Sequence, residues 1–322
     1  MKLRICLACS LVFLYVCFSC NKIELAPQVN DPDETIETPP TPEPVPPMLD
    51  YGDSIFYVKG KPGVDEYIAP KQPPGVKGKY VSWPAGLVMD ETTGRINLSL
   101  SPHGISFTIG FINISINDTT LITITISGVN YRSGIYVLEN NDTLAVPYYN
   151  ESISLLGLLG LSDDNDYPPP SPDGSGGGND KAEFDDGYDD DNGNGHDDEP
   201  PLGQRANDQN VRVRTTSGVI NLKKSVIDGA FGPNPKSGDM KQVRIYYRLN
   251  DNTRWALQYI DVTLYYYEYE SDIPSSLLSN VRKLMNEDQA RASGRVTTTD
   301  CKPRPPQIII TRYAGTNPDL TD

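Results

Sequence analysis

The residues best suited to chemistry lie in a short acidic stretch near the middle of the chain. Oxygen-bearing side chains alternate there at the first, third, fifth and ninth positions of a loop, and Gly195 holds the sixth. Loops bind calcium in this way, because alternating side chains converge on one hard cation and the glycine permits the bend. The candidate calcium ligands are Asp190, Asn192, Asn194, His196 and Asp198.

Two features of this loop weigh against a calcium site. The twelfth position, where a bidentate carboxylate is expected, is Pro201, and neither flank has a clear helical pattern. Sequence of low complexity that is rich in Asp, Asn and Gly also produces such spacing by chance. Calcium is therefore the one cofactor that the sequence raises, and a solvated spacer is the interpretation that it favours.

The remaining inventory of catalytic groups is small. The chain has two histidines, His103 and His196, and it lacks the HExxH, G-x-S-x-G and phosphate-loop motifs. Cys301 lacks a candidate histidine base except His103, which lies in the other candidate domain. We therefore predict that the protein is not an enzyme. Paired carboxylates acting on a glycosidic bond remain the alternative, although no particular pair is marked.

The amino terminus has the composition of an export signal. Lys2 and Arg4 precede an uncharged apolar run from Ile5 to Phe18, which ends at Ser19-Cys20. A basic head before a short apolar run is typical of a secretory signal, and the run is too short for a transmembrane helix, which needs about 20 residues. We predict a signal peptide over residues 1–19.

The junction Ser19-Cys20-Asn21 resembles the lipobox of bacterial lipoproteins, in its relaxed Bacteroidetes-type form, since Cys17 stands where leucine is common. The resemblance implies that Cys20 is lipidated and holds the protein at the outer membrane or cell surface. An ordinary cleaved signal is the alternative. Of the five cysteines, three lie within the signal, so Cys301 would have no disulfide partner and folding must depend on burial.

Composition divides the rest of the chain. Residues 20–50 form a tether rich in proline, and residues 163–201 form a linker of Asp, Gly and Pro, since neither can bury enough apolar surface to fold. Fourteen of the 43 acidic residues and one lysine lie within 163–199, so most of the net charge of −15 belongs to this linker. The folded parts are nearly neutral and carry no basic face for nucleic acid.

The first candidate domain spans residues 51–162 and its pattern predicts a β-sandwich. Apolar and polar residues alternate over 105–111, 121–126 and 135–138, and turn residues separate these runs. The stretch Trp83–Ile96 reads WPAGLVMDETTGRI and resembles the PxGLxxDxxTGxI pattern of Ig-like and cadherin-like domains in bacterial surface proteins. The resemblance implies an Ig-like sandwich of the adhesion or spacer kind, with a tight turn at Gly94 and a new strand from Ile96.

Three short sites in this domain have the form Asp-Ser/Thr-apolar. This form resembles the acceptor for O-glycosylation in exported proteins of Bacteroidetes, and it makes Ser54, Thr119 and Thr143 candidate glycosylation sites. Turn chemistry, in which Asp and Ser/Thr side chains bond to the nearby backbone, is the alternative interpretation.

The second candidate domain spans residues 202–315, before a tail at 316–322, and its pattern predicts an α+β fold. Alternation over 243–249 and 255–269 predicts a β-hairpin, and residues 307–311 predict a closing strand. Between them, an apolar stripe from Leu277 to Met285 predicts an amphipathic helix that begins near Asp272 and stops near Gly294. We thus expect a mainly β protein whose disordered acidic linker joins an Ig-like sandwich to an α+β domain.

Tyrosines are frequent in the second domain. On an alternating strand one set faces outward, and outward aromatic rings could stack on sugar or peptide, so the candidate binding surface is Tyr246, Tyr265 and Tyr267. Half-buried strands favour tyrosine in any case. We expect a membrane-anchored binding, adhesion or structural module with other envelope proteins or glycans as partners, and, as the alternative, a glycan-active enzyme or glycan-binding protein.

Overall fold

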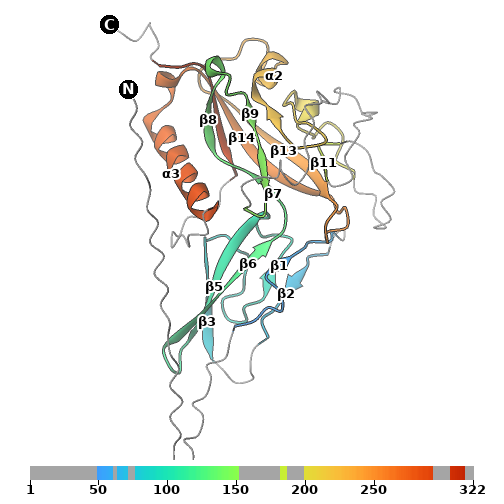
Figure 1. The fold of residues 1–322 in the computed structure, drawn as a ribbon, viewed down its shortest axis with the longest axis vertical. Helices are drawn as coiled ribbons and strands as arrows, with labels where there is room; N and C mark the ends of the chain where they lie inside the picture. Colours follow the sequence, from blue (N-terminus) through green and yellow to red (C-terminus); the bar gives the residue numbers. More distant parts are fainter. Residues whose placement is uncertain are drawn as a thin grey trace, which may run out of the picture. The chain divides into compact units, whose positions relative to one another are not determined.

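The structure is a computed structural model of the 322-residue chain. It describes residues 49–60, 64–71, 77–151, 182–186, 199–292 and 305–315, all of which belong to one compact unit, Pro46–Asp322. The fold of these residues is mainly β, as the alternating sequence predicts, and two larger sheets organise it (Figure 1). None of the helices described is long and apolar enough to cross a membrane.

The first sheet is built around one long hairpin. Its strands β5 (Ile105–Asn113) and β6 (Asp118–Ile126) pair in antiparallel fashion over their whole length. β3 (Gly78–Trp83) extends the sheet beyond β5, and β1 (Ile55–Phe56) joins β6 in parallel, giving the order β1-β6-β5-β3. The strands predicted at 105–111 and 121–126 are confirmed.

Only one face of this four-stranded sheet is covered by described residues. Side chains alternate between the two faces of a strand. The inward positions carry large apolar residues that are fully buried, including Phe107, Ile109 and Ile124. They pack on segment 49–58 and on a ribbon of β2 (Tyr67–Ile68) and β4 (Ile96–Asn97). The outward positions carry hydroxyls, and Ser106 and Thr125 are bonded across strands at 2.8 Å.

The stretch Trp83–Ile96 forms the turn that its sequence predicts. Gly94 has a φ of 69°, which suits glycine, and β4 begins at Ile96. Asp90 accepts the backbone N–H groups of Thr93 and Thr92 at 2.7 and 2.9 Å, and these bonds lower the Asp90 pKa. Among the described residues the layer facing the four-stranded sheet is the β2–β4 ribbon, so the Ig-like assignment stays a prediction.

The second sheet is mixed and has the order β11-β13-β14-β15-β8. The predicted hairpin is confirmed as β13 (Asp239–Leu249) and β14 (Gln258–Tyr269), which pair in antiparallel fashion. The predicted closing strand is β15 (Gln307–Tyr313), and it lies parallel to both β14 and β8 (Gly134–Val137). β11 (Ala182–Phe184) completes the other edge against β13.

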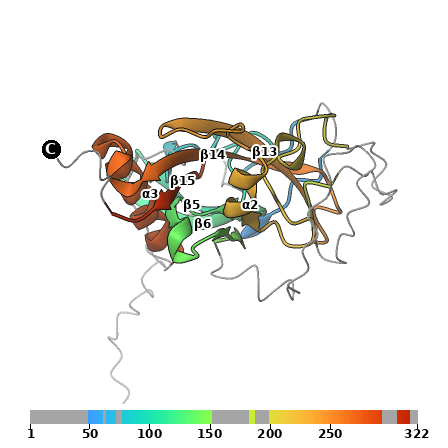
Figure 2. The same cartoon turned by 90° about the horizontal axis from the view of Figure 1, so that it is seen from above.

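Both faces of the five-stranded sheet carry a core. One core contains Ile245, Leu264 and Ile308 and is closed by short elements, which are β7 (Val129–Tyr131), β9 (Leu144–Ala145), β10 (Pro147–Tyr149), β12 (Ile220–Asn221) and α2 (Leu222–Ile227). On the other face α3 (Ser275–Ala292), the predicted amphipathic helix, packs through Val281 onto Tyr267 and Ile309. Figure 2 shows α3 along the β15 side of the sheet, apart from α2. Three single 3-10 turns complete the fold, at Leu138–Asn140, Asn207–Gln209 and Glu270–Asp272.

The sheets do not divide the chain where composition suggests. The sequence interpretation groups residues 129–149 with the four-stranded sheet, but β8 is an edge strand of the five-stranded sheet. Val129, Tyr131 and Ala145 are buried in the core of the five-stranded sheet as well. The change from one core to the other falls at about Ser127-Gly128, well before the acidic segment.

Part of the acidic segment is folded, which corrects the prediction of a continuous disordered linker over 163–201. Phe184 is fully buried, and its ring lies 6.1 Å from that of Tyr247. Glu183 faces Arg248 on the neighbouring strand at 3.8 Å. Ala182-Glu183-Phe184 is the one place in this segment where apolar residues alternate with a polar one, so composition averaged over a long window hides it.

Candidate binding cleft

A cleft of about 640 Å³ lies where the two sheets meet, and we call it the junction cleft. Its walls come from the segment before β2, the loop after β4 and the first residues of β14. The lining residues include Val58, Gly60, Val64, Asp65, Ser99, Leu100, Ser101, Pro102, His103, Tyr259, Asp261, Pro305 and Pro306. Its size and its mixture of apolar residues with a few polar ones match the general form of small-ligand sites.

One wall presents an aromatic ring that is held in place from behind. Tyr259 is 51% exposed, and the guanidinium carbon of Arg244 lies 3.7 Å from the centre of its ring. Arg244 in turn donates two hydrogen bonds to Asp261, at 2.8 and 3.0 Å. Hydrogen bonding to Asp261 raises the Arg244 pKa, so the cation persists at any working pH. This arrangement fixes the orientation of the Tyr259 ring.

The opposite wall presents a carboxylate. Asp65 accepts a hydrogen bond of 2.8 Å from the side-chain amide of the buried Asn97, and one of 3.3 Å from the Tyr67 hydroxyl. The guanidinium of Arg95 lies 3.8 Å from the centre of the Tyr67 ring. Tyr67 and Arg95 lie outside the cleft lining and support Asp65 from behind.

Polar contacts at the floor connect the two sheets. The Tyr247 hydroxyl donates to Gln258 at 2.8 Å and accepts the backbone N–H of Val129 at 3.2 Å. Gln258 donates to the carbonyl of Val58 at 3.4 Å. Burial lowers the pKa of His103, which keeps its imidazole neutral at pH 7 beside the Leu98 carbonyl. These bonds make the floor a rigid part of the fold.

The tyrosines named from sequence do not form an exposed row. Tyr246 and Tyr267 are each 5% exposed, and Tyr265 packs with Tyr267 in the core beneath α3. Tyr246 instead supports the cleft, since its ring meets the edge of Tyr259 at 6.4 Å. The prediction that these three offer a stacking surface is wrong, because α3 covers the part of the sheet face where two of them lie.

Tyr259 is an exposed tyrosine of this hairpin that the predicted binding surface left out. It lies on the same face of the sheet as Tyr265 and Tyr267, but nearer the start of β14, beyond the part that α3 covers. The signal in the sequence is that alternate residues of the two strands pair across the hairpin, Arg244 with Asp261 and Tyr246 with Tyr259. This pairing needs the register of the hairpin, which alternation alone does not supply.

Two of the candidate glycosylation residues, Ser54 and Thr143, come just before strands, and Thr119 is the second residue of β6, next to its turn. Ser54 and Thr119 are exposed and Thr143 is half-buried. The Asp53 carboxylate accepts the Ser54 N–H at 2.7 Å, and the Asp118 carboxylate accepts the Thr119 N–H at 2.8 Å. Two of the three sites thus show the turn chemistry of the alternative interpretation, which leaves their hydroxyls accessible.

The lipidation candidate Cys20 and the calcium candidates Asp190, Asn192, Asn194, His196 and Asp198 lie outside the described residues. In the parts of the chain that are described, no group of three or more His, Cys, Asp or Glu side chains could hold a metal ion. The calcium hypothesis therefore stays a prediction about residues 190–198.

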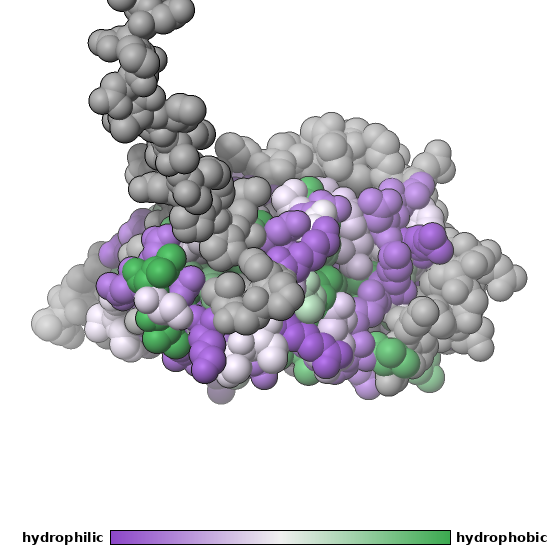
Figure 3. All heavy atoms as spheres, turned by 90° about the horizontal axis from the view of Figure 1, so that it is seen from below, coloured by the Kyte–Doolittle hydropathy of each residue, from purple (hydrophilic) through white to green (hydrophobic). Residues whose placement is uncertain are grey.

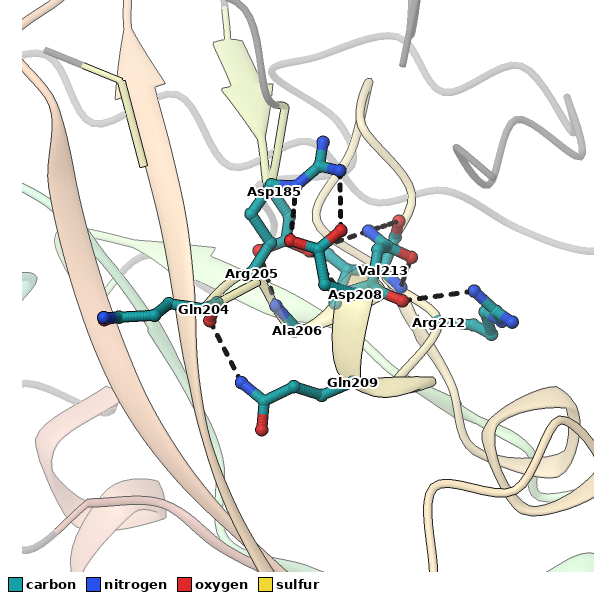
Figure 4. A network of polar contacts seen from close by, with 9 residues as sticks. Asp185, Gln204, Arg205, Ala206, Asp208, Gln209, Arg212 and Val213 are labelled. Atoms are coloured by element: carbon teal, nitrogen blue, oxygen red, sulfur yellow. Dashed lines mark hydrogen bonds and ion pairs between the residues drawn. The ribbon is translucent and has the colours of Figure 1, made fainter. Parts of the chain in front are cut away.

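A second polar cluster surrounds Asp185, at the end of β11 (Figure 4). Its buried carboxylate accepts the backbone N–H groups of Ala206 and Asn207, at 3.0 and 2.6 Å, and the Asn207 side-chain amide at 2.8 Å. Burial raises the Asp185 pKa to about 6, although these hydrogen bonds oppose the shift. The bonds tie the acidic segment to loop 204–213, so we interpret this cluster as a structural clasp.

Comparison with known proteins adds no identification. No family model matches the chain, and a search of curated proteins finds no match.

Proposed function

We propose that the protein is a lipid-anchored, non-catalytic binding module of the cell surface and that the junction cleft holds its ligand. The observation that carries this proposal is the pairing of an exposed, rigidly supported ring, Tyr259, with the carboxylate of Asp65 in one cleft. Arg244 fixes the ring, while Asn97 and Tyr67 fix the carboxylate. Groups fixed before a ligand arrives lose little entropy on binding.

The chemistry of the cleft fits a sugar ring. A tyrosine face offers an apolar platform for the C–H side of a sugar, and a carboxylate accepts hydrogen bonds from hydroxyls. The apolar remainder of the lining, which includes Val64, Leu100 and Pro102, would exclude water around such a ligand. A glycan of the envelope is therefore the ligand class that we assign to the cleft, and other envelope proteins are the alternative partners.

The groups of the cleft favour binding over catalysis. Both carboxylate oxygens of Asp261 accept hydrogen bonds from Arg244, so the group is engaged in a two-point ion pair. The neutral His103 lies at the floor against the Leu98 carbonyl. Both groups are thus engaged by other residues of the protein, which favours binding over proton transfer.

One observation favours a glycan-active enzyme as the second candidate, because Asp65 and Asp261 both line the cleft and glycosidases use pairs of carboxylates. Asp65→Asn and Asp261→Asn would each abolish hydrolysis of a polysaccharide substrate under this second candidate. Under our proposal the wild-type protein releases no reducing ends from that polysaccharide, whether or not it binds it.

Export and anchoring are the parts of the proposal that the signal sequence supports. Lipid on Cys20 would place the module at the outer membrane or cell surface, with residues 20–50 as the predicted tether. Cys20→Ala should release the protein from membranes in cell fractionation. If the variant stays with membranes as fully as wild type, the anchor is wrong. The Ig-like character of the first sheet, which would suit adhesion, belongs to this proposal too.

The ligand assignment is tested by an array of purified bacterial envelope oligosaccharides. The wild-type chain should bind at least one oligosaccharide class, and Asp65→Ala should lose most of that signal. The control is Asp239→Ala, because half-buried Asp239 lies at the start of β13, outside the cleft, and its carboxylate accepts only the local Lys236 N–H. Equal binding by Asp65→Ala and wild type would show that the ligand does not bind in the cleft.

A further inference from the structure

The end of the long hairpin carries apolar residues that nothing in the described fold covers. β5 and β6 are joined by the four residues Ile114-Ser115-Ile116-Asn117. Ile114 is 69% exposed and Ile116 is 60% exposed, and Leu121 on the outer face of β6 is 60% exposed. We call these three residues the apolar tip. Figure 3 views the molecule from the lower end of Figure 1 and shows patches of hydrophobic residues among hydrophilic ones there.

The turn does not need its isoleucines. Asn117 supplies the left-handed conformation, with a φ of 50°, and Asn113 accepts the Ser115 N–H at 3.0 Å. On the other side of the turn, Asp118 accepts the Thr119 N–H. These Asn and Asp contacts are the usual means of closing a tight loop, and polar residues normally fill the remaining positions. Two exposed isoleucines in a loop of four thus have no role in forming the loop.

The chain enters the fold at the same end as the apolar tip. β1 runs parallel to β6, with Ile55 opposite Thr125, so the residues before β1 run back along β6 toward the tip. The Tyr51 hydroxyl donates to the Gly94 carbonyl at 2.7 Å. Gly94 packs on the ring of Tyr80. Tyr80 pairs with Phe111, which lies two residues before Asn113, where the pairing of β5 with β6 ends at the tip. The first described residue, Leu49, therefore starts from the tip end of the sheet.

We propose that the apolar tip dips into the bilayer that carries the lipid on Cys20, so that the tether and the tip hold the module to the membrane at two points. This inference rests on the proposed lipid anchor. The anchor at Cys20 would be separated by 28 residues from Leu49, which is at the tip end of the sheet, so the anchor raises the effective concentration of the tip at the bilayer. Apolar side chains that reach the acyl boundary add to the binding of a lipid chain, and stable anchoring usually takes two such signals.

The test uses the full lipidated chain reconstituted in vesicles. Ile116→Trp places a reporter at the tip, and lipids brominated on their acyl chains quench an indole that enters the bilayer. We expect quenching of the added indole above the background of Trp83 and Trp255 in the unmodified chain. Leu202→Trp is the matched control, because Leu202 is 85% exposed and lies elsewhere on the fold, so its indole should stay unquenched.

A second measurement keeps the two proposals separable. Chain lacking the lipid is mixed with vesicles, and Ile114→Ser with Ile116→Ser should lower its partitioning roughly tenfold or more, since each isoleucine buries substantial apolar area. Leu202→Ser with Ile227→Ser, at positions 85% and 71% exposed, should leave partitioning unchanged. An anchored chain whose indole at 116 is unquenched overturns the tip alone, whereas a chain that is not retained by vesicles overturns the anchor. A spectral change that appears without vesicles and rises with protein concentration would assign the tip to a second copy and overturn the proposal.

Discussion

The two sheets of this protein differ in how much of them is covered. The five-stranded sheet carries a core on each face, one closed by short strands and α2 and the other closed by α3. Among the described residues, the four-stranded sheet carries a core on one face, and its other face presents hydroxyls with Leu121 and half-buried Trp83 around Gly110. The proposed contacts with ligand and membrane lie at the junction and at the end of the less covered sheet.

This difference in coverage indicates which surfaces are available to contact a ligand or a membrane. A sheet covered on both faces has little exposed side-chain surface left, so Tyr247 and Tyr267 serve as packing, and Tyr259 is exposed at the start of β14, beyond the part that α3 covers. A sheet covered on one face keeps a free face and a free end, which cost little stability and can contact partners. If this comparison holds, substitutions of buried residues in the five-stranded sheet should affect folding, and those at the tip and the cleft, Tyr259 included, should affect binding.

The largest effect is expected at the strand within the acidic segment. Phe184→Ala removes a fully buried ring from the edge of the five-stranded sheet and should lower the free energy of unfolding by about 3–5 kcal/mol. Leu202→Ala, at a residue 85% exposed, should change it by less than about 0.5 kcal/mol. Urea unfolding followed by circular dichroism measures both. Equal unfolding midpoints for the two variants would contradict the finding that β11 is part of the fold, and residues 163–201 would again be interpreted as a linker.

A smaller effect, and one that depends on pH, is expected at Asp185. Its pKa of about 6 in the fold lies above the ordinary 3.8, so folding favours the protonated form. The stability that this group contributes is therefore present at low pH and is lost as pH rises through about 6. Between about pH 7.5 and 5, wild type should gain about 1 kcal/mol of unfolding free energy relative to Asp185→Asn, which does not titrate. A difference between the two proteins that is constant with pH contradicts the buried-carboxylate account.

The smallest effect is expected on the open face of the four-stranded sheet. Leu121→Thr replaces a side chain that is 60% exposed and restores the hydroxyl pattern of its neighbours, so unfolding free energy should change by less than about 0.5 kcal/mol. Ile124→Thr, three residues along the same strand but fully buried, should cost several times more. A large loss from Leu121→Thr would show that this face is covered in the native protein.

The sequence predicts the strands of this protein better than it predicts their surroundings. Alternation at 105–111, 243–249 and 255–269 identifies β5 and the β13–β14 hairpin, and the stripe from Leu277 identifies α3. Alternation states which residues share a face, but not what covers that face. Tyr267 and Tyr259 have the same parity on β14, and only the position of α3 separates the buried ring from the exposed one.

The features that the sequence does not predict are pairings between segments that are distant in the chain. β8 lies parallel to β15, about 170 residues later in the chain, and no local signal marks a parallel partner. β11 has three residues within a strongly acidic stretch, and only the burial of Phe184 and Ala182 reveals it. Asp65 and Tyr259 meet at one cleft because the two sheets adjoin, which is a tertiary fact that neither strand pattern contains.

The most direct test of the account is a calorimetric titration of three proteins with purified envelope oligosaccharides. Wild type should bind at least one of them saturably, and Tyr259→Ala should weaken that binding roughly tenfold or more, as expected when an aromatic anchor is removed. Tyr313→Ala is the matched control, because Tyr313 also lies beside an arginine, Arg312 at 5.3 Å, but outside the cleft, and it should bind like wild type. Failure of wild type to bind any of the oligosaccharides, or equal affinities for wild type and Tyr259→Ala, would contradict the claim that the junction cleft is a glycan site.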